Sequence, residues 1–120
     1  MKTAKDPRHR KRIKVMQLLF SWQFKPEKKV AKEITDILTH IKKIDQLVAS
    51  SAKNRPIDQI NKIDLAILRL AVFELIINKE PPKVVIDEAI ELGKEYGSDS
   101  SSSFINGTLG QVVKLKKIKL

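Results

Sequence analysis

The residues with the clearest chemical potential form a cationic run close to the start of the chain. Arginine and lysine crowd there, at positions Arg8, Arg10, Lys11, Arg12 and Lys14. Such side chains bind the phosphates of nucleic acids, with an affinity that falls as salt rises and with little preference for sequence. The run leads directly into an apolar stretch, so a buried helix body would hold these cations in a defined geometry.

The net charge of +10 is concentrated at the two ends of the chain. Residues 1–14 carry a net charge of +6 and residues 114–120 carry +4, whereas residues 15–113 are neutral. This distribution is typical of a protein that binds a polyanion. The alternative is a basic arm at residues 1–12 and a basic tail at residues 114–120 that are merely solvated and frayed.

Residue types that support catalysis or metal binding are scarce. The chain has no cysteine, and its two histidines, His9 and His40, lie far apart in the sequence and outside any nucleophile motif. We expect His9 to add to the cationic run and His40 to lie on a helix surface. Glu88, Glu91 and Glu95 recur at helical spacing and are interpreted as a solvated face. The sequence therefore predicts a protein that is not an enzyme, with no cofactor and no metal site.

A second candidate group lies near the end of the chain, in the segment SFINGTLGQVV. Phe104 offers a ring for stacking on a base, and Asn106 offers an amide for hydrogen bonds to a base edge. Proteins recognise single-stranded RNA through contacts of these two kinds. A place in the hydrophobic core is the competing interpretation for Phe104. Gly107 and Gly110 weaken a helix and leave a face that either a nucleic acid or a packed helix could approach closely.

Helices must position these groups, because no segment shows the two-residue alternation of a strand. Residues 63–77 are apolar on every side, so this helix is expected at the centre of the fold. Ser98 or Asp99 can cap the helix that holds Phe104. The predicted helices span about residues 7–24, 27–52, 63–77 and 82–96, with a short turn after Pro56 and a last helix through Val113.

Length and composition bound the remaining possibilities. Residues 1–120 are too few for a catalytic domain plus a binding domain, and they predict one all-α domain, a compact bundle of about five to six helices. No apolar run approaches the roughly 20 residues that span a bilayer. The absence of cysteine suits a reducing compartment. We therefore expect a cytoplasmic protein that does not insert into a membrane.

Four segments occur in an order and spacing that resemble the NusB family of transcription antitermination factors. They are RHRKRIKVMQLLFSWQF, IDLAILRLAVFEL, PPKVVIDEAIELGKEYG and SFINGTLGQVV. The resemblance covers nearly the whole chain and implies an all-helical RNA-binding protein without catalytic activity. It further implies binding to boxA, a single-stranded element of ribosomal RNA leaders, together with the ribosomal protein NusE in the RNA polymerase elongation complex.

The resemblance also implies roles for individual residues. The arginine-rich RNA motif falls on Arg8, Arg10, Lys11 and Arg12, and further RNA contacts fall on Ser100, Phe104 and Asn106. The side that meets NusE falls on Phe20, Asp64 and Glu74. Ser100 stands where an aspartate is common in the family, and Phe20 stands where a tyrosine is frequent. Because Ser100 lacks a carboxylate and Phe20 lacks a hydroxyl, the resemblance does not establish the polar contacts at these two positions.

The interval between Phe24 and Asp45 is shorter than is usual in the resembled family, by about one helix. One helix of the first subdomain would then be missing. A homodimer is one way to cover the apolar surface that such a loss exposes.

Two other classes of function fit the same residues. The chain resembles the RNA-binding module that is fused to ribosomal RNA cytosine methyltransferases, and any catalysis would then need a second chain. A helical protein that binds duplex DNA or an anionic membrane surface would use the same cations. Competition between boxA-like RNA, scrambled RNA, duplex DNA and anionic liposomes distinguishes these classes.

Overall fold

The computed structural model describes residues 6–26 and 29–120, so residues 1–5 of the predicted basic arm lie outside the description. Within the described residues the chain forms six α-helices and two 3-10 turns, and no strand. The helices are α1 (Pro7–Phe24), α2 (Thr35–Thr39), α3 (Ile41–Ser51), α4 (Lys62–Ile77), α5 (Pro82–Tyr96) and α6 (Ser101–Leu115), and the turns are η1 (Lys32–Ile34) and η2 (Ile57–Gln59). The predicted all-α bundle is confirmed.

Local sequence signals set several helix ends. The Asp6 carboxylate accepts a hydrogen bond from the Arg8 backbone N–H at 2.9 Å, and Pro7 occupies the first helical position, so α1 begins where the sequence predicts. The Asn61 side chain accepts hydrogen bonds from the first backbone N–H groups of α4. Asn78 ends the same helix in the left-handed conformation.

The helical region predicted over about residues 27–52 is helical from Lys32 to Ser51 but is interrupted where the chain turns at His40, and residues 27–28 lie outside the description. The backbone there has φ −102° and ψ 9°, which separates α2 from α3. The Asp36 carbonyl accepts a hydrogen bond from the Thr39 hydroxyl at 2.7 Å and lies 2.8 Å from His40 Nδ1. Side chains that bind a backbone carbonyl in this way compete with the helical hydrogen bonds.

The start of the last helix also differs from the prediction. Neither Ser98 nor Asp99 caps it, since α6 begins at Ser101 after Ser100, whose side chain makes no capping hydrogen bond. Instead of a side chain before the helix accepting from a helix N–H, a side chain of the helix accepts from a backbone N–H before it. The Ser101 hydroxyl accepts a hydrogen bond from the Ser98 backbone N–H at 2.9 Å, which tightens the connection from α5.

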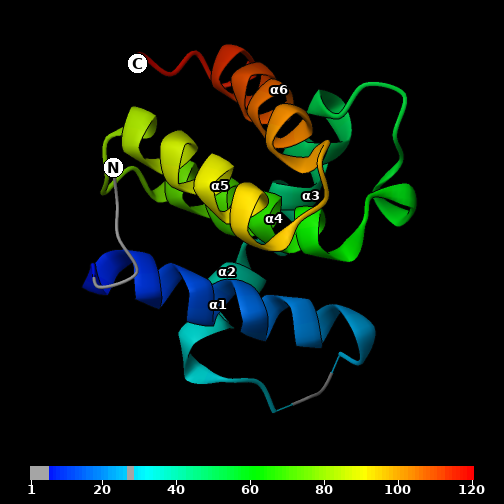
Figure 1. Ribbon diagram of the computed structural model, residues 1–120, viewed down its shortest axis with the longest axis vertical. Helices are drawn as coiled ribbons and strands as arrows, with labels where there is room; N and C mark the ends of the chain where they lie inside the picture. The colour runs from blue at the N-terminus through cyan, green and yellow to red at the C-terminus, as the bar shows by residue number, and fades with distance from the viewer. Residues whose placement is uncertain (1–5, 27–28) are drawn as a thin grey trace.

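The central helix is α4, as its apolar sequence predicts. It packs against α1, α3, α5 and α6. Figure 1 shows α1 along one side of the bundle and the paired α5 and α6 along the other. The buried guanidinium of Arg69 donates twice to the Asp45 carboxylate at 2.9 Å, so this central charge has a partner on α3. Every helix within the described ranges is too short or too polar to span a lipid bilayer.

The body of α1 anchors the first turns of that helix. Val15, Met16 and Leu19 are buried, and each such side chain contributes about 1.5–3 kcal/mol when fully removed from water. Arg10, Lys14, Gln17 and Ser21, which recur every three or four residues and so share one face of the helix, are exposed on the other side. The sequence before Val15 is therefore held on a fixed helix.

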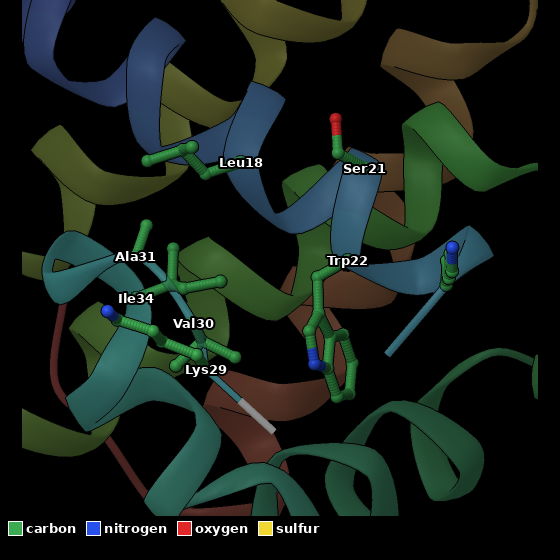
Figure 2. Close-up of a pocket in the computed structure, with 8 residues that line it drawn as sticks. Leu18, Ser21, Trp22, Lys29, Val30, Ala31 and Ile34 are labelled. Carbon is green, nitrogen blue, oxygen red and sulfur yellow. The ribbon is translucent and has the colours of Figure 1, made fainter. Parts of the chain in front are cut away.

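A hollow of about 230 Å³ lies beside α1, next to the interval that follows this helix. Leu18 and Trp22 line it from α1, and Val30 and Ile34 line it from the returning chain (Figure 2). The interval still contributes η1 and the five-residue α2 to the fold. Self-association through this apolar surface stays a prediction.

Candidate nucleic-acid interface

The first turns of α1 present three cations to solvent. Arg8, Arg10 and Lys11 are exposed, and together they are called the cationic face below. Lys14 is also exposed, but its ammonium lies 3.0 Å from a carboxylate oxygen of Glu33. This hydrogen bond lowers the pKa of Glu33 and offsets part of the positive charge of Lys14. Arg8 Nε also lies 4.0 Å from a carboxylate oxygen of Asp6, so the three side chains of the cationic face are exposed but not all of them are free of a nearby negative charge.

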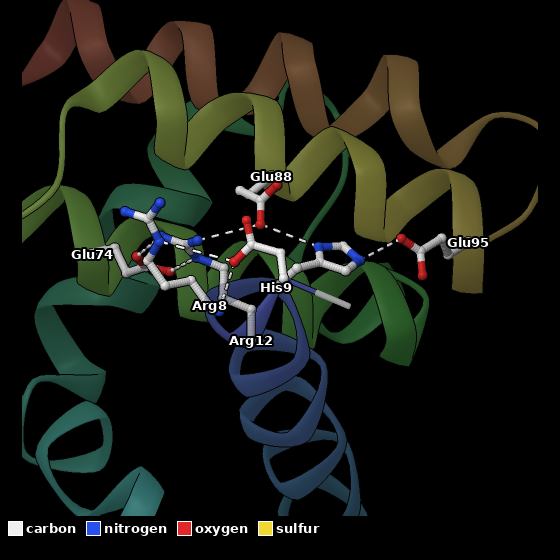
Figure 3. Close-up of polar contacts among 7 residues, drawn as sticks. Arg8, His9, Arg12, Glu74, Glu88 and Glu95 are labelled. Carbon is white, nitrogen blue, oxygen red and sulfur yellow. Dashed lines mark hydrogen bonds and ion pairs between the residues drawn. The ribbon is translucent and has the colours of Figure 1, made fainter. Parts of the chain in front are cut away.

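Arg12 is not part of the cationic face, because its side chain is buried and only 7% exposed. Its Nε and Nη2 donate to the two carboxylate oxygens of Glu74 at 3.0 and 2.7 Å, and its Nη1 donates to Glu88 at 3.3 Å (Figure 3). A two-bond fork onto one carboxylate is the strongest geometry available to arginine. Arg12 thus holds α1 to α4 and α5, a position that does not fit the predicted RNA contact.

His9 lies next to Arg12 in the contact between α1 and α5. Its Nδ1 is 3.2 Å from Glu88 and its Nε2 is 2.6 Å from Glu95. Both ring nitrogens can donate to ionised carboxylates at the same time only when His9 is protonated, so this arrangement favours the imidazolium form. Burial by itself lowers the pKa of His9, but the hydrogen bonds and charges of Glu88 and Glu95 outweigh it and raise that pKa above 6.5.

The two cations and three carboxylates of this contact form a charge cluster of His9, Arg12, Glu74, Glu88 and Glu95. The interpretation of Glu88 as part of a solvated face is wrong, since it is 1% exposed. Removing one member of such a buried group leaves an uncompensated charge, which is strongly destabilising. The cluster therefore fixes the orientation of the α1 turns that carry the cationic face.

The charge of His9 makes stability depend on pH. Since the folded pKa lies above the unfolded value of about 6.5, the stabilisation is complete below pH of about 6.5 and is lost as pH rises through the folded pKa. This stabilisation amounts to about 1.4 kcal/mol for each unit by which the folded pKa exceeds the unfolded pKa. We predict that urea unfolding shows this loss as the pH is raised from about 6.5 through the folded pKa, and that His9→Gln abolishes it.

The other histidine supplies the control for this measurement. His40 is half-buried, packs edge-on against Phe73 with ring centroids 5.5 Å apart, and has no carboxylate among its hydrogen-bond partners within the described residues. His40→Gln should keep the pH dependence of the wild type. If the unfolding free energy still depended on pH in His9→Gln but no longer did so in His40→Gln, the attribution of this pH dependence to His9 would be wrong.

The second predicted group lies at the start of α6. Ser100 and Asn106 are exposed, whereas Phe104 is half-buried and packs against the core. The guanidinium of Arg55 lies over the Phe104 ring, 4.1 Å from its centroid. Phe104 therefore contributes to the core and still meets a cationic group at the surface.

The charge cluster links the two candidate groups. Glu95, which binds His9, lies in the last turn of α5, and the chain then connects through residues 97–100 to α6. The cationic face is thus held beside the helix whose end leads into Ser100. Sequence position alone gives no sign of this proximity, because His9 and Glu95 are 86 residues apart.

Two of the residues predicted to face NusE are internal. Asp64 is 3% exposed, and its Oδ1 has no hydrogen-bond partner among the described residues. Glu74 lies about 15 Å further along α4, at 1.5 Å per residue, with its carboxylate bound by Arg12. The structure therefore does not bring Asp64 and Glu74 together as an open acidic pair.

The third of these residues, Phe20, lies closer to a surface. It is half-buried and packs edge-on against Phe24, with ring centroids 4.8 Å apart. Phe24 is 61% exposed, and Lys62 Nζ lies 5.9 Å from the centroid of its ring. This end of α1 offers an aromatic surface with an adjacent cation.

Sequence reasoning missed the structural role of His9 and Glu88, although one signal was present. His9, Arg12, Met16 and Leu19 are separated by three or four residues, which places them on one face of a helix. Because Met16 and Leu19 are fully buried, the two basic residues on that face needed carboxylate partners. No group of three or more metal-binding side chains within the described residues has an arrangement that could hold an ion.

Comparison with known proteins identifies a family. The model of the NusB family matches residues 27–114. Transcription antitermination protein NusB of Roseiflexus castenholzii is 49% identical over 77 residues, which cover 62% of this chain and 54% of that relative. The corresponding protein of Finegoldia magna is 43% identical over 85 residues, with coverages of 70% and 62%. The chain spans about half the length of the first of these curated relatives.

Two solved structures have the same fold. The structure of T. maritima NusB matches with a TM-score of 0.79 and 30% identity, over 95% of this chain and 93% of that chain. A chain from the crystal structure of a plectonemic RNA supercoil matches with a TM-score of 0.79 and 26% identity, over 94% of this chain and 99% of that chain. The chain belongs to the NusB family, and the relatives named above are transcription antitermination proteins.

Proposed function

We propose that this protein binds single-stranded boxA-type RNA of ribosomal RNA leaders and, together with NusE, promotes antitermination by the elongating RNA polymerase. Residues 1–120 would act as one RNA-binding module, without a catalytic step and in the cytoplasm, where such transcripts emerge. The observation that carries the proposal is the cationic face, fixed by the buried His9 and Arg12. The names of the relatives and the RNA in one matching structure support the same class of ligand.

The cationic face and the residues at the start of α6 would make different contributions to RNA recognition. Arg8, Arg10 and Lys11 would contact phosphates and supply affinity, with Lys14 contributing less because of Glu33. The start of α6 would supply selectivity for particular bases. There, Phe104 offers a stacking surface, and Ser100 and Asn106 offer hydrogen-bonding groups.

The surface for NusE would lie at the other end of α1. We retain Phe20 in this surface, together with the exposed Phe24. Aromatic side chains in a protein interface bury a large area at a low cost in conformational entropy. Asp64 and Glu74 are left out of the proposed contact because both are engaged or enclosed within the fold.

The salt dependence of RNA binding tests the role of the cationic face. Each phosphate contact on a single strand contributes about 0.7 to the slope of log affinity against log salt. We predict that replacing Arg8, Arg10 and Lys11 with alanine reduces that slope by about 2 and weakens boxA-like and scrambled RNA similarly. The charge-matched control replaces the exposed Lys42, Lys43 and Lys83 and should leave the slope nearly unchanged. Equal slopes in the two triple variants would overturn the proposal.

Competition experiments separate this function from the alternatives. Wild-type protein should prefer boxA-like RNA over scrambled RNA, duplex DNA and anionic liposomes. Equal binding to all four would indicate a general polyanion-binding protein. A preference for a folded ribosomal RNA fragment over boxA-like RNA would favour a module that serves an rRNA-modifying enzyme.

A further inference from the structure

The lysines after the body of α6 have no part in the function proposed so far. Residues 114–120 carry a net charge of +4. Three of their lysines, called the lysine tail below, are Lys116, Lys117 and Lys119. All three are exposed, and none forms an ion pair with a carboxylate of the described residues. Their charge is therefore available to an anionic ligand.

The lysine tail is held on the fold by the way α6 ends. The Ile118 backbone N–H donates to the Val113 carbonyl at 3.0 Å, and the Lys117 N–H donates to the Lys114 carbonyl at 3.1 Å. This pair of hydrogen bonds is the Schellman motif, which ends many helices. Ile118 is half-buried and packs against the core. The interpretation as a frayed tail therefore does not describe residues 116–118.

Lys117 occupies a position whose backbone favours glycine. Its φ is 53°, in the left-handed region, where a Cβ atom makes the conformation costly. The corresponding residue of a Schellman motif is usually glycine and sometimes asparagine. The other residues with positive φ in the described part of the chain are Asn54 and Asn78. A lysine is thus placed here at a cost in stability, which points to a role of its side chain outside the fold.

The lysine tail lies beside the turn that joins α4 to α5. Its three lysines line a hollow of about 440 Å³ together with Asn78 and Pro82. Leu75, Ile76 and Ile118 complete the lining, so no carboxylate of the described residues belongs to it. This side of the α4–α5 turn is therefore positively charged.

The cationic face lies on the other side of the same turn. Arg8 and Lys11 line a second hollow, of about 360 Å³, together with Lys79 and Glu80 of the turn. Figure 1 shows the start of α1, this turn and the end of the chain toward the left of the view. Lys79 is exposed. The cationic face and the lysine tail therefore flank one turn, which carries a cation of its own.

Acidic side chains restrict the path that a polyanion can take between these two groups. Four of them line the hollow on the α1 side, namely Glu33, Asp36, Glu74 and Glu80. Carboxylates repel phosphates, so a phosphate chain avoids the interior of this hollow. The remaining path crosses the outer side of the turn at Lys79.

We propose that the lysine tail binds the phosphates of an RNA flank that continues from the cationic face across the α4–α5 turn. The strand meets Arg8 and Lys11, then Lys79, and then the three lysines of the tail. Contacts of this kind supply affinity with little preference for sequence. The inference rests on the RNA-binding function proposed above and adds a second contact, for the part of the transcript outside the element whose bases are recognised.

A nucleic acid fits this surface better than a lipid bilayer does. Helices that lie on a membrane insert an apolar face into it, whereas Ile118 is turned into the protein. Leu115 and Leu120 are exposed beside the lysines, so anionic vesicles form one arm of the test.

The length of the RNA provides the test. Affinity is measured for a boxA-like RNA and for the same RNA extended at one end or the other by about six uridines, a length within known site sizes. Replacing the three tail lysines with glutamine should lower the salt slope for one of the two extended RNAs by about 2, at about 0.7 for each phosphate. Between about 50 and 200 mM salt this difference in slope amounts to about 16-fold in affinity. The slope for the unextended RNA should not change.

Two control variants keep the result interpretable. Lys29→Gln with Lys42→Gln and Lys43→Gln removes the same charge from other exposed positions and should retain the effect of the extension. Lys117→Gly removes one tail charge and also the Cβ atom from the left-handed position. It should therefore melt at a higher temperature than the wild type, yet show a slope for the extended RNA that is lower by about 0.7.

The outcomes separate this inference from the function on which it rests. If the wild type binds neither the short nor the extended RNA with a salt-dependent affinity, the proposed function fails. If it binds both, but the tail variant and the charge-matched control respond equally to the extension, only the role of the lysine tail is overturned. Weaker binding of the tail variant to phosphatidylserine vesicles, with an unchanged effect of the extension, would likewise overturn it, because the tail would then serve a membrane.

Discussion

Arg12→Met should lower the free energy of unfolding by about 3–5 kcal/mol. Removing the guanidinium leaves Glu88, which is 1% exposed, with only His9 as a cationic partner, and leaves Glu74 with none in the charge cluster. Methionine retains most of the aliphatic stem, so the loss reports the charge and its hydrogen bonds more than packing. Urea denaturation at neutral pH measures the effect, which is a large part of the about 5–15 kcal/mol that stabilises a domain.

Arg10→Met is the matched control, on the same turn of α1 but exposed. Its effect on stability should stay within about 0.5 kcal/mol, whereas its RNA affinity should fall because a phosphate contact is lost. The two arginines would thus separate a structural role from an RNA-binding role. Equal stabilities of the Arg10 and Arg12 variants would show that the charge cluster does not hold α1 in place.

Glu74→Lys should destabilise the protein by a similar amount, about 3–5 kcal/mol. The substitution replaces the acceptor of the two-bond fork with a second cation against the buried Arg12. Sequence reasoning favours a different outcome, in which Glu74 faces NusE and its reversal leaves the melting temperature nearly intact. The geometry favours the internal ion pair, and the affinity of the remaining folded protein for NusE should then equal that of the wild type.

Glu91→Lys controls for charge reversal by itself. Glu91 lies 3.9 Å from Lys94 in a partly exposed pair, and such pairs contribute about 0–1 kcal/mol. Thermal melting and NusE binding of both variants are compared at the same temperature, below their transitions. If Glu74→Lys melts like the wild type but binds NusE more weakly, the acidic group belongs to the partner surface and the internal assignment is wrong.

Local signals explain why the helices themselves could be predicted. The cap at Asp6, the proline at position 7 and the all-round apolar residues 63–77 act through neighbouring residues, so α1 begins and α4 is central as expected. The break at His40 was missed because it depends on side chains that bind the Asp36 carbonyl. Propensity alone does not show which of two competing hydrogen bonds forms.

The candidate site was predicted only in part, because the exposure of its residues depends on partners that are distant in the sequence. The sequence by itself determined that cations are concentrated in the first turns of a buried helix, since charge and periodicity can be read along the chain. Only the tertiary structure decided which of them face solvent. Arg10 and Arg12 are two residues apart, yet Arg12 meets Glu74 and Glu88, which lie 62 and 76 residues away. Such a pairing depends on helix packing, because burial without these carboxylates would leave the guanidinium uncompensated.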